Sequence, residues 1–335
     1  MIKRFIVITS IFPPSEAVQR FARFDRWRLV VVGDRKTPRG WTCPGVEFMS
    51  LARQAHLDYK LAELLPRDHY ARKMLGYLRA VGQGAGIIVD TDDDNVPRRN
   101  WGFPDFEGRY RVSPADRGFV NVYRCYSHQH IWPRGLPLEC ILRPAALLDE
   151  QEFDQRTVRV GIWQGLVDGE PDVDAVYRLT SNAPCRFEAG VPVVLGRGTL
   201  CPFNSQNTAF ARELFPLMYL PAHVTFRFTD ILRGYVAQPI IWRCGYHLGF
   251  TAATVVQRRN PHDAMDDFAS EIPFYLHAEK IVETVEAAIS ARATITDNLV
   301  LAYEGLVRKG IVPRREMAVL QAWIADVQRA RAGAP

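Results

Sequence analysis

The residues from 87 to 95, Ile-Ile-Val-Asp-Thr-Asp-Asp-Asp-Asn, constrain this chain more than any other stretch, because an apolar run ends there in four acids. A few apolar, β-branched residues bounded by polar ones predict a buried strand. Carboxylates crowded at the end of such a strand repel one another and raise each other's pKa. A divalent cation relieves this repulsion, and Mg²⁺ or Mn²⁺ prefers oxygen ligands. The run therefore predicts a metal–diphosphate site of the Asp-x-Asp kind, with a solvated acidic turn as the alternative.

The first hundred residues alternate between predicted strands and helices. Apolar runs at 5–9 and 29–33 indicate strands that are covered on both faces. Helices are expected at 15–26, 52–65 and 70–82, the last of which leads into the acidic strand. This alternation predicts an α/β fold with a mostly parallel sheet. Because open α/β sheets bind ligands at the carboxyl ends of their strands, the acids stand where a nucleotide site is expected.

The rest of the chain divides into a loop-rich part and a helical part. Residues 101–260 are rich in proline, glycine and aromatic residues, with short strands expected at 191–195 and 251–256. Long irregular segments of this kind are typical of loops that build a site. From residue 279 onward the apolar spacing is helical. The predicted division is therefore a main domain over 1–278 and a helical extension over 279–335.

Composition excludes several classes of protein. With 47% hydrophobic and 24% charged residues, the 335-residue chain is ordinary for a globular protein. The net charge of +5 is too small and too evenly spread to indicate a nucleic-acid partner, but it is compatible with a diphosphate-bearing ligand or with peripheral contact with an acidic membrane. Six scattered cysteines without a Cys-x-x-Cys pair are typical of reduced thiols. No apolar run approaches the length of a membrane span, so the cytoplasm is the expected location.

Two pairs of residues are candidates for nucleotide contacts. Asp34 and Lys36 follow the second predicted strand, where an acid can accept a hydrogen bond from a base or ribose and a lysine can meet a phosphate. The alternative is an Asp-led turn with surface charges. Arg72 and Lys73 open the helix before the acidic strand and would neutralise phosphate oxygens, unless they belong to a solvated basic face.

Further polar residues are candidates for metal binding, catalysis and sugar contacts. His262 follows the strand expected at 251–256 and could complete a metal shell, although a lone histidine is usually structural. Asp230 stands at a predicted helix start, as either an N-cap or a catalytic carboxylate. Asn204 and Asn207 suit sugar hydroxyls and suit loop stabilisation equally well. The segments around Trp132, Trp163 and Tyr219 are expected to offer flat apolar faces to an acceptor sugar.

As a set, the motifs of this chain resemble the STELLO glycosyltransferase-like family. They resemble more distantly the reversibly glycosylated polypeptides, which are the UDP-arabinopyranose mutases of plants. The resemblance runs in order from about residue 5 to residue 280. It is carried by the stretches 32–38 (Val-Gly-Asp-Arg-Lys-Thr-Pro), 72–78, 90–95, 131–138 (Ile-Trp-Pro-Arg-Gly-Leu-Pro-Leu), 168–175, 198–204 and 229–234 (Thr-Asp-Ile-Leu-Arg-Gly).

The resemblance implies a GT-A-like fold, with a mixed sheet, flanking helices and a C-terminal helical extension. It implies that a nucleoside diphosphate sugar binds through the Asp-x-Asp site. We expect Asp92 and Asp94 to hold Mn²⁺ or Mg²⁺, with His262 as a further ligand. The residues expected to bind the nucleotide sugar are Thr9, Asp34, Lys36, Arg72, Lys73, Asp92, Asp93, Asn204 and Asn207. In the mutase relatives, the Arg-Gly pair corresponding to Arg134-Gly135 carries the residue that becomes linked to sugar.

The function expected from the sequence is metal-dependent glycosyl transfer. The enzyme would transfer a hexosyl or pentosyl group from a nucleotide sugar, expected to be a UDP-sugar, to a glycan acceptor such as a surface polysaccharide. Asp230 is the expected general base, and Arg134 is expected to position phosphate or sugar oxygens. Two alternatives are a nucleotide-sugar mutase that uses Arg134 and a non-catalytic scaffold that keeps a nucleotide-sugar pocket. A complete Asp-x-Asp run together with Asp230 favours an enzyme.

Overall fold

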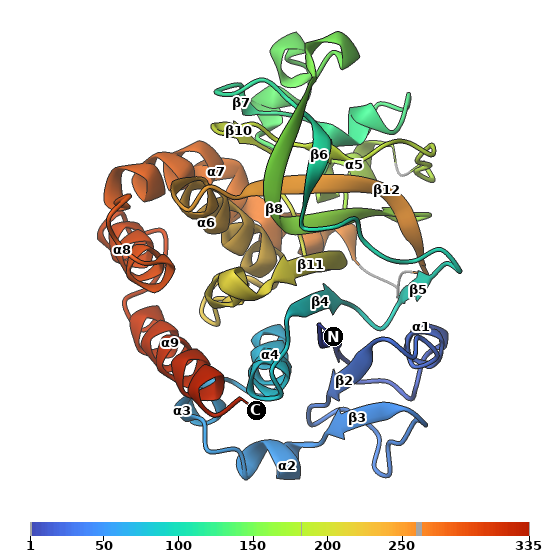
Figure 1. The fold of residues 1–335 in the computed structure, drawn as a ribbon, viewed down its shortest axis with the longest axis vertical. Helices are drawn as coiled ribbons and strands as arrows, with labels where there is room; N and C mark the ends of the chain where they lie inside the picture. Colours follow the sequence, from blue (N-terminus) through green and yellow to red (C-terminus); the bar gives the residue numbers. More distant parts are fainter. Residues whose placement is uncertain (1, 182, 259–262, 335) are drawn as a thin grey trace.

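The computed structural model describes residues 2–181, 183–258 and 263–334. Within these residues, a ten-stranded mixed sheet forms the centre of the fold, in the spatial order β3-β2-β1-β4-β11-β8-β6-β9-β12-β5, and a small second sheet joins β10 and β7 (Figure 1). The strands are β1 (Arg4–Thr9), β2 (Arg28–Val32), β3 (Val46–Met49), β4 (Ile87–Thr91), β5 (Asn95–Pro97), β6 (Glu107–Val112), β7 (Gly118–Phe119), β8 (Asp154–Asp168), β9 (Val193–Val194), β10 (Thr199–Leu200), β11 (Asn207–Ala211) and β12 (His247–Gln257).

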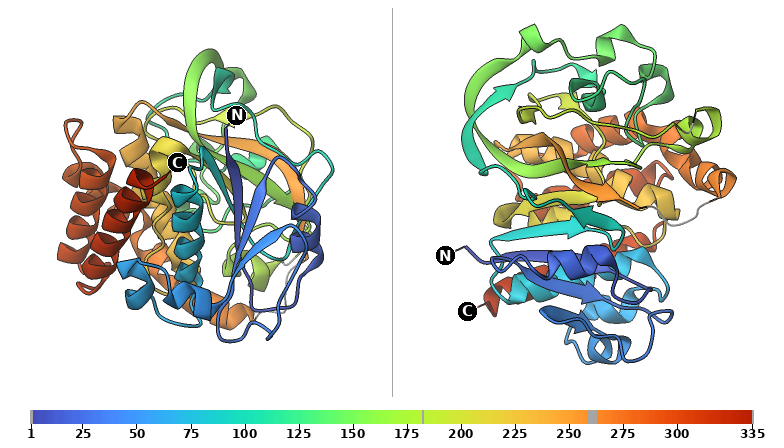
Figure 2. Two further views of the ribbon diagram at one scale, coloured as in Figure 1. Left: turned by 60° about the horizontal axis from the view of Figure 1, so that its bottom comes forward. Right: turned by 90° about the vertical axis from the view of Figure 1, so that its right-hand side faces the viewer.

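Helices cover the sheet unequally. The helix α4 lies directly on β1 and β2, and α9 packs on the outer side of α4 (Figure 2, left). The helices α6, α7 and α8 pack against one another and continue this layer. The helices are α1 (Glu16–Phe21), α2 (Leu51–Ala55), α3 (Lys60–Leu64), α4 (Lys73–Gly82), α5 (Ala175–Thr180), α6 (Thr229–Arg243), α7 (Ala264–Ala288), α8 (Ile295–Arg308) and α9 (Glu316–Ala332).

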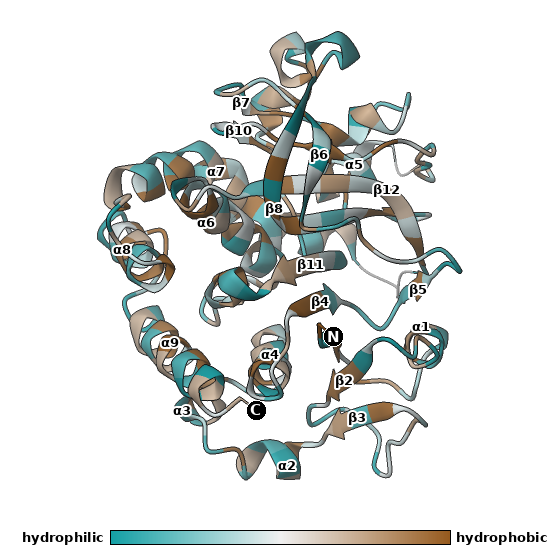
Figure 3. Ribbon diagram, in the orientation of Figure 1, coloured by the Kyte–Doolittle hydropathy of each residue, from teal (hydrophilic) through white to brown (hydrophobic). Residues whose placement is uncertain are grey.

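The strand β1 shows why the N-terminal part folds as an α/β unit. Its residues alternate between the two faces of the sheet. Phe5 and Val7 belong to the core that includes α4, whereas Ile6 and Ile8 belong to a second core that includes Val18 of α1. Both faces are buried, which explains the continuous apolar runs, and β2 and β4 are likewise hydrophobic along most of their length in Figure 3. The predicted α/β fold with a large mixed sheet and flanking helices is confirmed.

Parallel and antiparallel strands meet beside the acidic run. The strand β1 pairs in parallel with β2 and with β4, whereas β11 runs antiparallel to β4 and to β8. The carboxyl ends of β1, β2 and β4 therefore lie along one edge of the sheet, as the sequence predicts. The long strand β8, its partner β6 and the antiparallel strand β11 were not predicted, because their residues do not form isolated apolar runs.

Two predicted helices are shorter in the structure. The helix expected over 15–26 ends at Phe21, and the helix expected over 52–65 is divided into α2 and α3. The break before α3 has a tertiary cause. The backbone N–H of Leu61, in the first turn of α3, donates to the buried carboxylate of Asp326 in α9 at 2.8 Å. The Asp326 carboxylate, 265 residues away in the sequence, thus helps to determine where α3 begins. The residues near α3 alone do not predict this start.

The C-terminal helices are joined closely to the rest of the fold. The helix α7 begins at Ala264, so the boundary predicted between 278 and 279 falls inside a continuous helix. In α9, the fully buried carboxylate of Glu316 accepts hydrogen bonds from the Tyr219 hydroxyl and, at 2.8 Å each, from the N–H groups of Ala222 and His223. The turn at 219–223 therefore depends on an acceptor supplied by the last helix.

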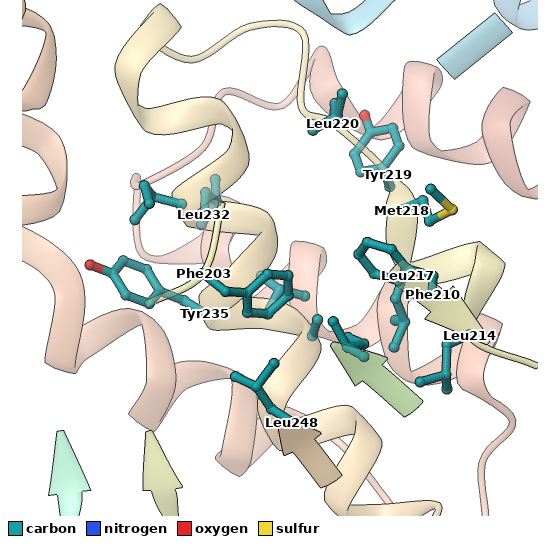
Figure 4. Packing of buried hydrophobic residues seen from close by; sticks show 14 of the residues in the cluster. Phe203, Phe210, Leu214, Leu217, Met218, Tyr219, Leu220, Leu232, Tyr235 and Leu248 are labelled. Carbon is teal, nitrogen blue, oxygen red and sulfur yellow. The ribbon is translucent and has the colours of Figure 1, made fainter. Parts of the chain in front are cut away.

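The largest core lies between the sheet and the helix layer. Figure 4 shows part of it, where Phe203 lies near Leu232 and Tyr235 of α6 and Phe210 lies beside Leu214 and Leu217. These side chains are almost completely buried. In the part of the chain that the structure describes, no helix is both long enough and apolar enough to cross a membrane.

Candidate active site

A pocket of about 440 Å³ opens at the carboxyl ends of β1, β2 and β4. Small-molecule sites typically have volumes of roughly 300–1,000 Å³. One wall consists of the turns that follow the three strands, and the opposite wall includes the 3₁₀ helix η7 (Phe226–Phe228) and the first turn of α6. The predicted site residues that line this pocket are Thr9, Asp34, Lys36, Arg72, Asp92, Asp93, Asp94, Arg134 and Asp230.

Asp34 is held in place by backbone donors at the end of β2. Its Oδ1 accepts from the N–H of Arg35 at 2.8 Å, and its Oδ2 accepts from the N–H of His69 at 3.2 Å. Lys36, two residues further on, is exposed. The carboxylate of Asp34 therefore keeps one orientation at the pocket wall, with a flexible cation beside it.

Arg72 stabilises the same turn through hydrogen bonds to other protein groups. Its guanidinium donates to Oε1 of Gln54 at 2.9 and 2.5 Å and to the carbonyl of Leu65 at 3.1 Å. The amide of Gln54 in turn donates to the carbonyl of Gly33 at 2.7 Å, next to Asp34. Arg72 lies 3.9 Å from the Asp34 carboxylate and is only 5% exposed. Its contacts are thus mostly with protein, although one edge of the side chain reaches the pocket.

Asp90, the first acid of the run, lies inside the protein rather than in the pocket. Its Oδ1 is 2.7 Å from Nζ of Lys73, and its Oδ2 accepts from Arg233 at 2.6 Å. The Arg233 guanidinium in turn lies 5.7 Å and 5.2 Å from the ring centroids of Phe203 and Phe210. Burial alone would raise the pKa of Asp90, but the two cations lower it below its usual value. Asp90 is therefore a paired structural carboxylate at the base of the run.

Asp92 is the first acid that faces the pocket. Its Oδ1 accepts at 2.8 Å from both the Tyr70 hydroxyl and the Lys73 ammonium. Tyr70 and Lys73 are three residues apart, so they lie on the same side of the helical turn. Burial raises the pKa of Asp92, and Lys73 offsets that only in part. These contacts fix Oδ1 of Asp92, whereas Oδ2 has no hydrogen bond among the described residues that line this pocket.

Lys73 does not line the pocket. Its side chain is fully buried between Asp90 and Asp92, and these carboxylates raise the pKa of its ammonium although burial acts to lower it. The contact predicted between Lys73 and a phosphate is replaced in the structure by a contact with Asp92. The positive charge of Lys73 reaches the pocket only through that carboxylate.

Asp93 and Asp94 are half-buried carboxylates that line the pocket. Asp93 accepts from the Ser10 hydroxyl, and Asp94 Oδ2 accepts from the Gln257 amide at 2.9 Å. Oδ1 of Asp94 is buried without a hydrogen-bond partner. Burial raises the pKa of Asp93 to about 6, and burial together with the charge of Asp92 raises the pKa of Asp94 to about 7. Among the described residues, neither carboxylate forms an ion pair, in contrast to Asp90.

The acids fit a metal ion only if other ligands contribute. Among residues 2–181, 183–258 and 263–334, no group of three or more His, Cys, Asp and Glu side chains is arranged to hold a metal. His262, the predicted third ligand, lies outside the described residues. Mg²⁺ commonly uses one or two carboxylates and completes its shell with water and phosphate oxygens. The unpartnered Oδ1 of Asp94 and the free oxygen of Asp92 are compatible with that arrangement.

Arg134 lies between two carboxylates on the opposite wall. It donates to Asp172 through Nε and Nη2 at 2.7 Å each, and to Asp230 through Nη2 at 2.9 and 3.0 Å. Its Nη1 donates to the backbone carbonyl of Arg227. Burial acts to lower the pKa of Arg134, but the two carboxylates raise it well above the ordinary value. The guanidinium is therefore permanently charged and fixed in orientation.

Asp230 is bound on two sides. Besides Arg134, the backbone N–H of Ser205 donates to its Oδ2 at 3.2 Å. The residue stands in the first turn of α6, as the sequence predicts, and its side chain is 10% exposed. The carboxylate is thus oriented toward the pocket with its charge compensated by Arg134.

Asn204 and Asn207 lie behind the pocket lining. Oδ1 of Asn204 accepts from the N–H of Gln206, and the carbonyl of Asn204 accepts from Arg233. Asn207 is fully buried in β11, where it bonds to the indole of Trp101 at 3.0 Å and to Thr254 at 3.2 Å. Both amides stabilise the loop and sheet that support the site.

The aromatic side chains in the segments that were expected to contact an acceptor sugar do not line the pocket. Trp132, Trp163 and Tyr219 are at most 5% exposed, because each is used in the core or in a buried hydrogen bond. The pocket lining instead includes Phe12 and Phe226, which are 44% and 56% exposed.

Several lining residues were not predicted as members of the site. Ser10, Tyr70 and Gln257 contact the acids directly, and Arg227 lines the opposite wall. The spacing of Tyr70 and Lys73 could have indicated Tyr70. Gln257 and Arg227 are brought to the pocket only by tertiary structure.

Comparison with known proteins gives relatives over nearly the whole chain. A family model described as STELLO glycosyltransferases matches residues 227–333. Probable glycosyltransferase STELLO2 of Arabidopsis thaliana is 27% identical over 348 residues, which cover 97% of this chain and 44% of that protein. Probable glycosyltransferase STELLO1 of the same plant is 26% identical over 346 residues, with the same coverage. The chain thus spans less than half the length of these relatives. By these matches, the chain is similar to the STELLO glycosyltransferases over nearly its whole length.

Proposed function

We propose that this chain transfers a sugar from a nucleoside diphosphate sugar, UDP-linked, to a carbohydrate acceptor. The observation that carries the proposal is the placement of Asp92, Asp93 and Asp94 at the end of β4, in the same pocket as Asp34 at the end of β2. A diphosphate near the three acids would place its nucleoside toward Asp34 and its sugar toward Asp230. The relatives named as probable glycosyltransferases agree with this reaction class.

Mn²⁺ or Mg²⁺ is the proposed cofactor. Oδ1 of Asp94 and the free oxygen of Asp92 would hold the ion, with the diphosphate supplying further oxygens. When bound, such an ion stabilises the negative charge that grows on the diphosphate leaving group. The buried Oδ1 of Asp94, which has no hydrogen-bond partner, supports this assignment, because such an atom is unfavourable unless a ligand satisfies it.

Asp230 is the proposed general base. Removing the proton of the acceptor hydroxyl requires an ionised carboxylate with a fixed orientation. Arg134 and Ser205 hold the carboxylate of Asp230 in this way. Only modest basicity is needed, because the hydroxyl becomes more acidic as its bond to the sugar forms.

The contacts of Arg134 favour a transferase over a covalent mutase. A guanidinium becomes a nucleophile only if it loses its proton, and Arg134 is held charged by Asp172 and Asp230. Its Nε, Nη1 and Nη2 all donate to protein acceptors. Arg134 therefore acts, in this proposal, as a cation that positions Asp230 and sugar oxygens.

Incubation with Mn²⁺ and a panel of pyranose nucleotide sugars tests the reaction class. We expect UDP release and a lengthened glycan when a neutral oligosaccharide acceptor is added, and an unchanged donor without it. Mass spectrometry and NMR measure both products. A furanose nucleotide sugar, or a sugar adduct on Arg134, in the sample without acceptor would instead identify a mutase.

The substitution Asp34→Ala is expected to weaken UDP binding by roughly 10- to 100-fold, the usual range for losing a hydrogen bond to a charged group. The rate at saturating donor should change little, since a contact with the base is shared by the ground and transition states. Calorimetry and initial rates measure the two effects. Asp25→Ala, which changes an exposed aspartate far from the pocket, is the matched control. An equal fall in affinity in both variants would remove Asp34 from the nucleotide site.

A further inference from the structure

His69 lines the pocket next to Asp34, at the end that the proposed function assigns to the nucleoside. Its backbone N–H donates to Oδ2 of Asp34 at 3.2 Å, and its imidazole lies close enough for that carboxylate to act on its pKa. The next side chain, that of Tyr70, reaches Asp92 instead. The two neighbouring residues thus serve different ends of the pocket, and His69 belongs to the end near Asp34.

One ring nitrogen of His69 is used within the protein. His69 is the N-cap of the 3₁₀ helix η1 (Tyr70–Arg72), and its Nδ1 accepts from the N–H of Ala71 at 3.1 Å. A ring nitrogen that accepts a hydrogen bond carries no proton, so the neutral imidazole has its proton on Nε2. Burial lowers the pKa of His69, which favours the neutral ring at pH 7. Nε2 forms no hydrogen bond among the described residues, so its N–H is available to a ligand.

Asp34 presents acceptors beside this donor. Its oxygens accept from the N–H groups of Arg35 and His69, and each carboxylate oxygen can accept a second hydrogen bond. The pair therefore complements a group in which an N–H stands next to a carbonyl. Uracil presents such an edge, N3–H and O4, on the side of its ring farthest from the ribose, and guanine presents a similar one. Cytosine and adenine present instead a ring nitrogen without hydrogen beside an amino group.

We propose that His69 is a specificity-determining residue, which donates its Nε2–H to O4 of uracil while Asp34 accepts N3–H, so that the pocket takes uracil and rejects cytosine. This inference rests on the proposed function. Cytosine would place the lone pair of N3 against the Asp34 carboxylate and its amino group against the N–H of His69. A site built to form hydrogen bonds discriminates against a ligand that sets acceptor against acceptor and donor against donor.

The test compares UDP with CDP as ligands of the full chain, by calorimetry with Mn²⁺ and without an acceptor sugar. The two nucleotides share the ribose and the diphosphate, and they differ only at N3 and C4 of the base. We expect CDP to bind the unchanged protein at least about tenfold more weakly than UDP, as for the loss of a hydrogen bond to a charged group. The ratio of the two dissociation constants is the measured quantity, because it cancels any change in affinity for the diphosphate.

Two substitutions separate the donor of His69 from its role as a cap. Asparagine and serine are both good N-caps that can accept from Ala71, but neither extends an N–H as far as Nε2. We expect His69→Asn and His69→Ser to weaken UDP binding by roughly three- to tenfold, as for one neutral hydrogen bond, and not to weaken CDP binding. A thermal melt checks that the cap is kept. His128→Asn, which changes an exposed histidine outside the pocket lining, is the matched control and should leave the ratio unchanged.

The outcomes separate this inference from the proposed function. Absence of UDP binding by the unchanged protein would overturn both. Tight UDP binding with equal affinity for CDP would overturn the base selection alone, and this comparison needs no variant. If both His69 variants weakened UDP and CDP by the same factor, His69 would contact the ribose or the diphosphate, and its assignment to the base would be wrong. A ratio as wide in these variants as in His128→Asn would likewise remove His69 from base recognition.

Discussion

Replacing Asp94 by alanine is expected to weaken UDP binding by about a hundredfold or more in the presence of Mn²⁺, because even residues that only support a metal ligand typically contribute 10- to 100-fold. Addition of a chelator should weaken UDP binding by a similar factor in the unchanged protein. The fold should survive the substitution, since Oδ1 of Asp94 has no partner and only the contact with Gln257 is lost. Calorimetry measures the affinity, and a thermal melt measures the stability.

Asp94→Asn separates charge from shape in this experiment. It keeps an oxygen that can accept from Gln257 but removes the negative charge, so it should bind UDP nearly as weakly as the alanine variant. Chelator should have little further effect on either variant. If UDP bound equally well in the presence of chelator, the assignment of a metal ion to this site would be wrong. If the unchanged protein and Asp94→Ala bound UDP with equal affinity, Asp94 would not be a metal ligand.

The substitution Asp230→Asn is expected to lower the rate of sugar transfer by roughly 10²- to 10⁴-fold, the usual contribution of a general base. Donor affinity should stay close to that of the unchanged protein, because Asp172 continues to hold Arg134 by two hydrogen bonds. Initial rates with saturating donor and acceptor measure the first effect, and calorimetry with UDP measures the second.

A positioning role for Asp230 would give a different pattern. If its main task were to orient Arg134, Asp230→Asn and Arg134→Lys would lower the rate by similar factors, and the rate of the asparagine variant would keep the pH profile of the parent. Loss of a base should instead change the acidic limb of that profile. Transfer at the parent rate would exclude Asp230 and direct attention to Asp172, the neighbouring carboxylate in the pocket lining.

The parts of the site that follow strand ends could be predicted from the sequence. The runs before Asp34 and Asp92 are apolar enough to identify buried strands, and parallel strands bring their carboxyl ends to one edge. Asp230 could be placed because an acid at the start of a helix is a recognisable local pattern. In each case, the chemistry of the residue and its secondary structure are encoded within a few neighbouring positions.

The rest of the site depends on contacts between distant segments. Gln257 reaches Asp94 across 163 residues, and Arg233 reaches Asp90 across 143 residues. The phosphate contact predicted for Lys73 depended on its charge alone. In the structure, the side chain of Lys73 is fully buried, and its ammonium contacts Asp90, Asp92 and the Tyr70 hydroxyl. Sequence indicates which residues carry charge, but only the packing of elements decides which charges neutralise each other.

The buried carboxylate of Glu316 limits how the parts of this fold can be exchanged. Three donors in the turn at 219–223 depend on it, and the same turn leads into η7 and the start of α6, where Asp230 stands. A chimaera that took its last helices from a relative without an acidic residue at this position would leave buried N–H groups unsatisfied just ahead of the active site. The C-terminal helices therefore cannot be exchanged alone, and a chimaera must take them from the same protein as the turn at 219–223.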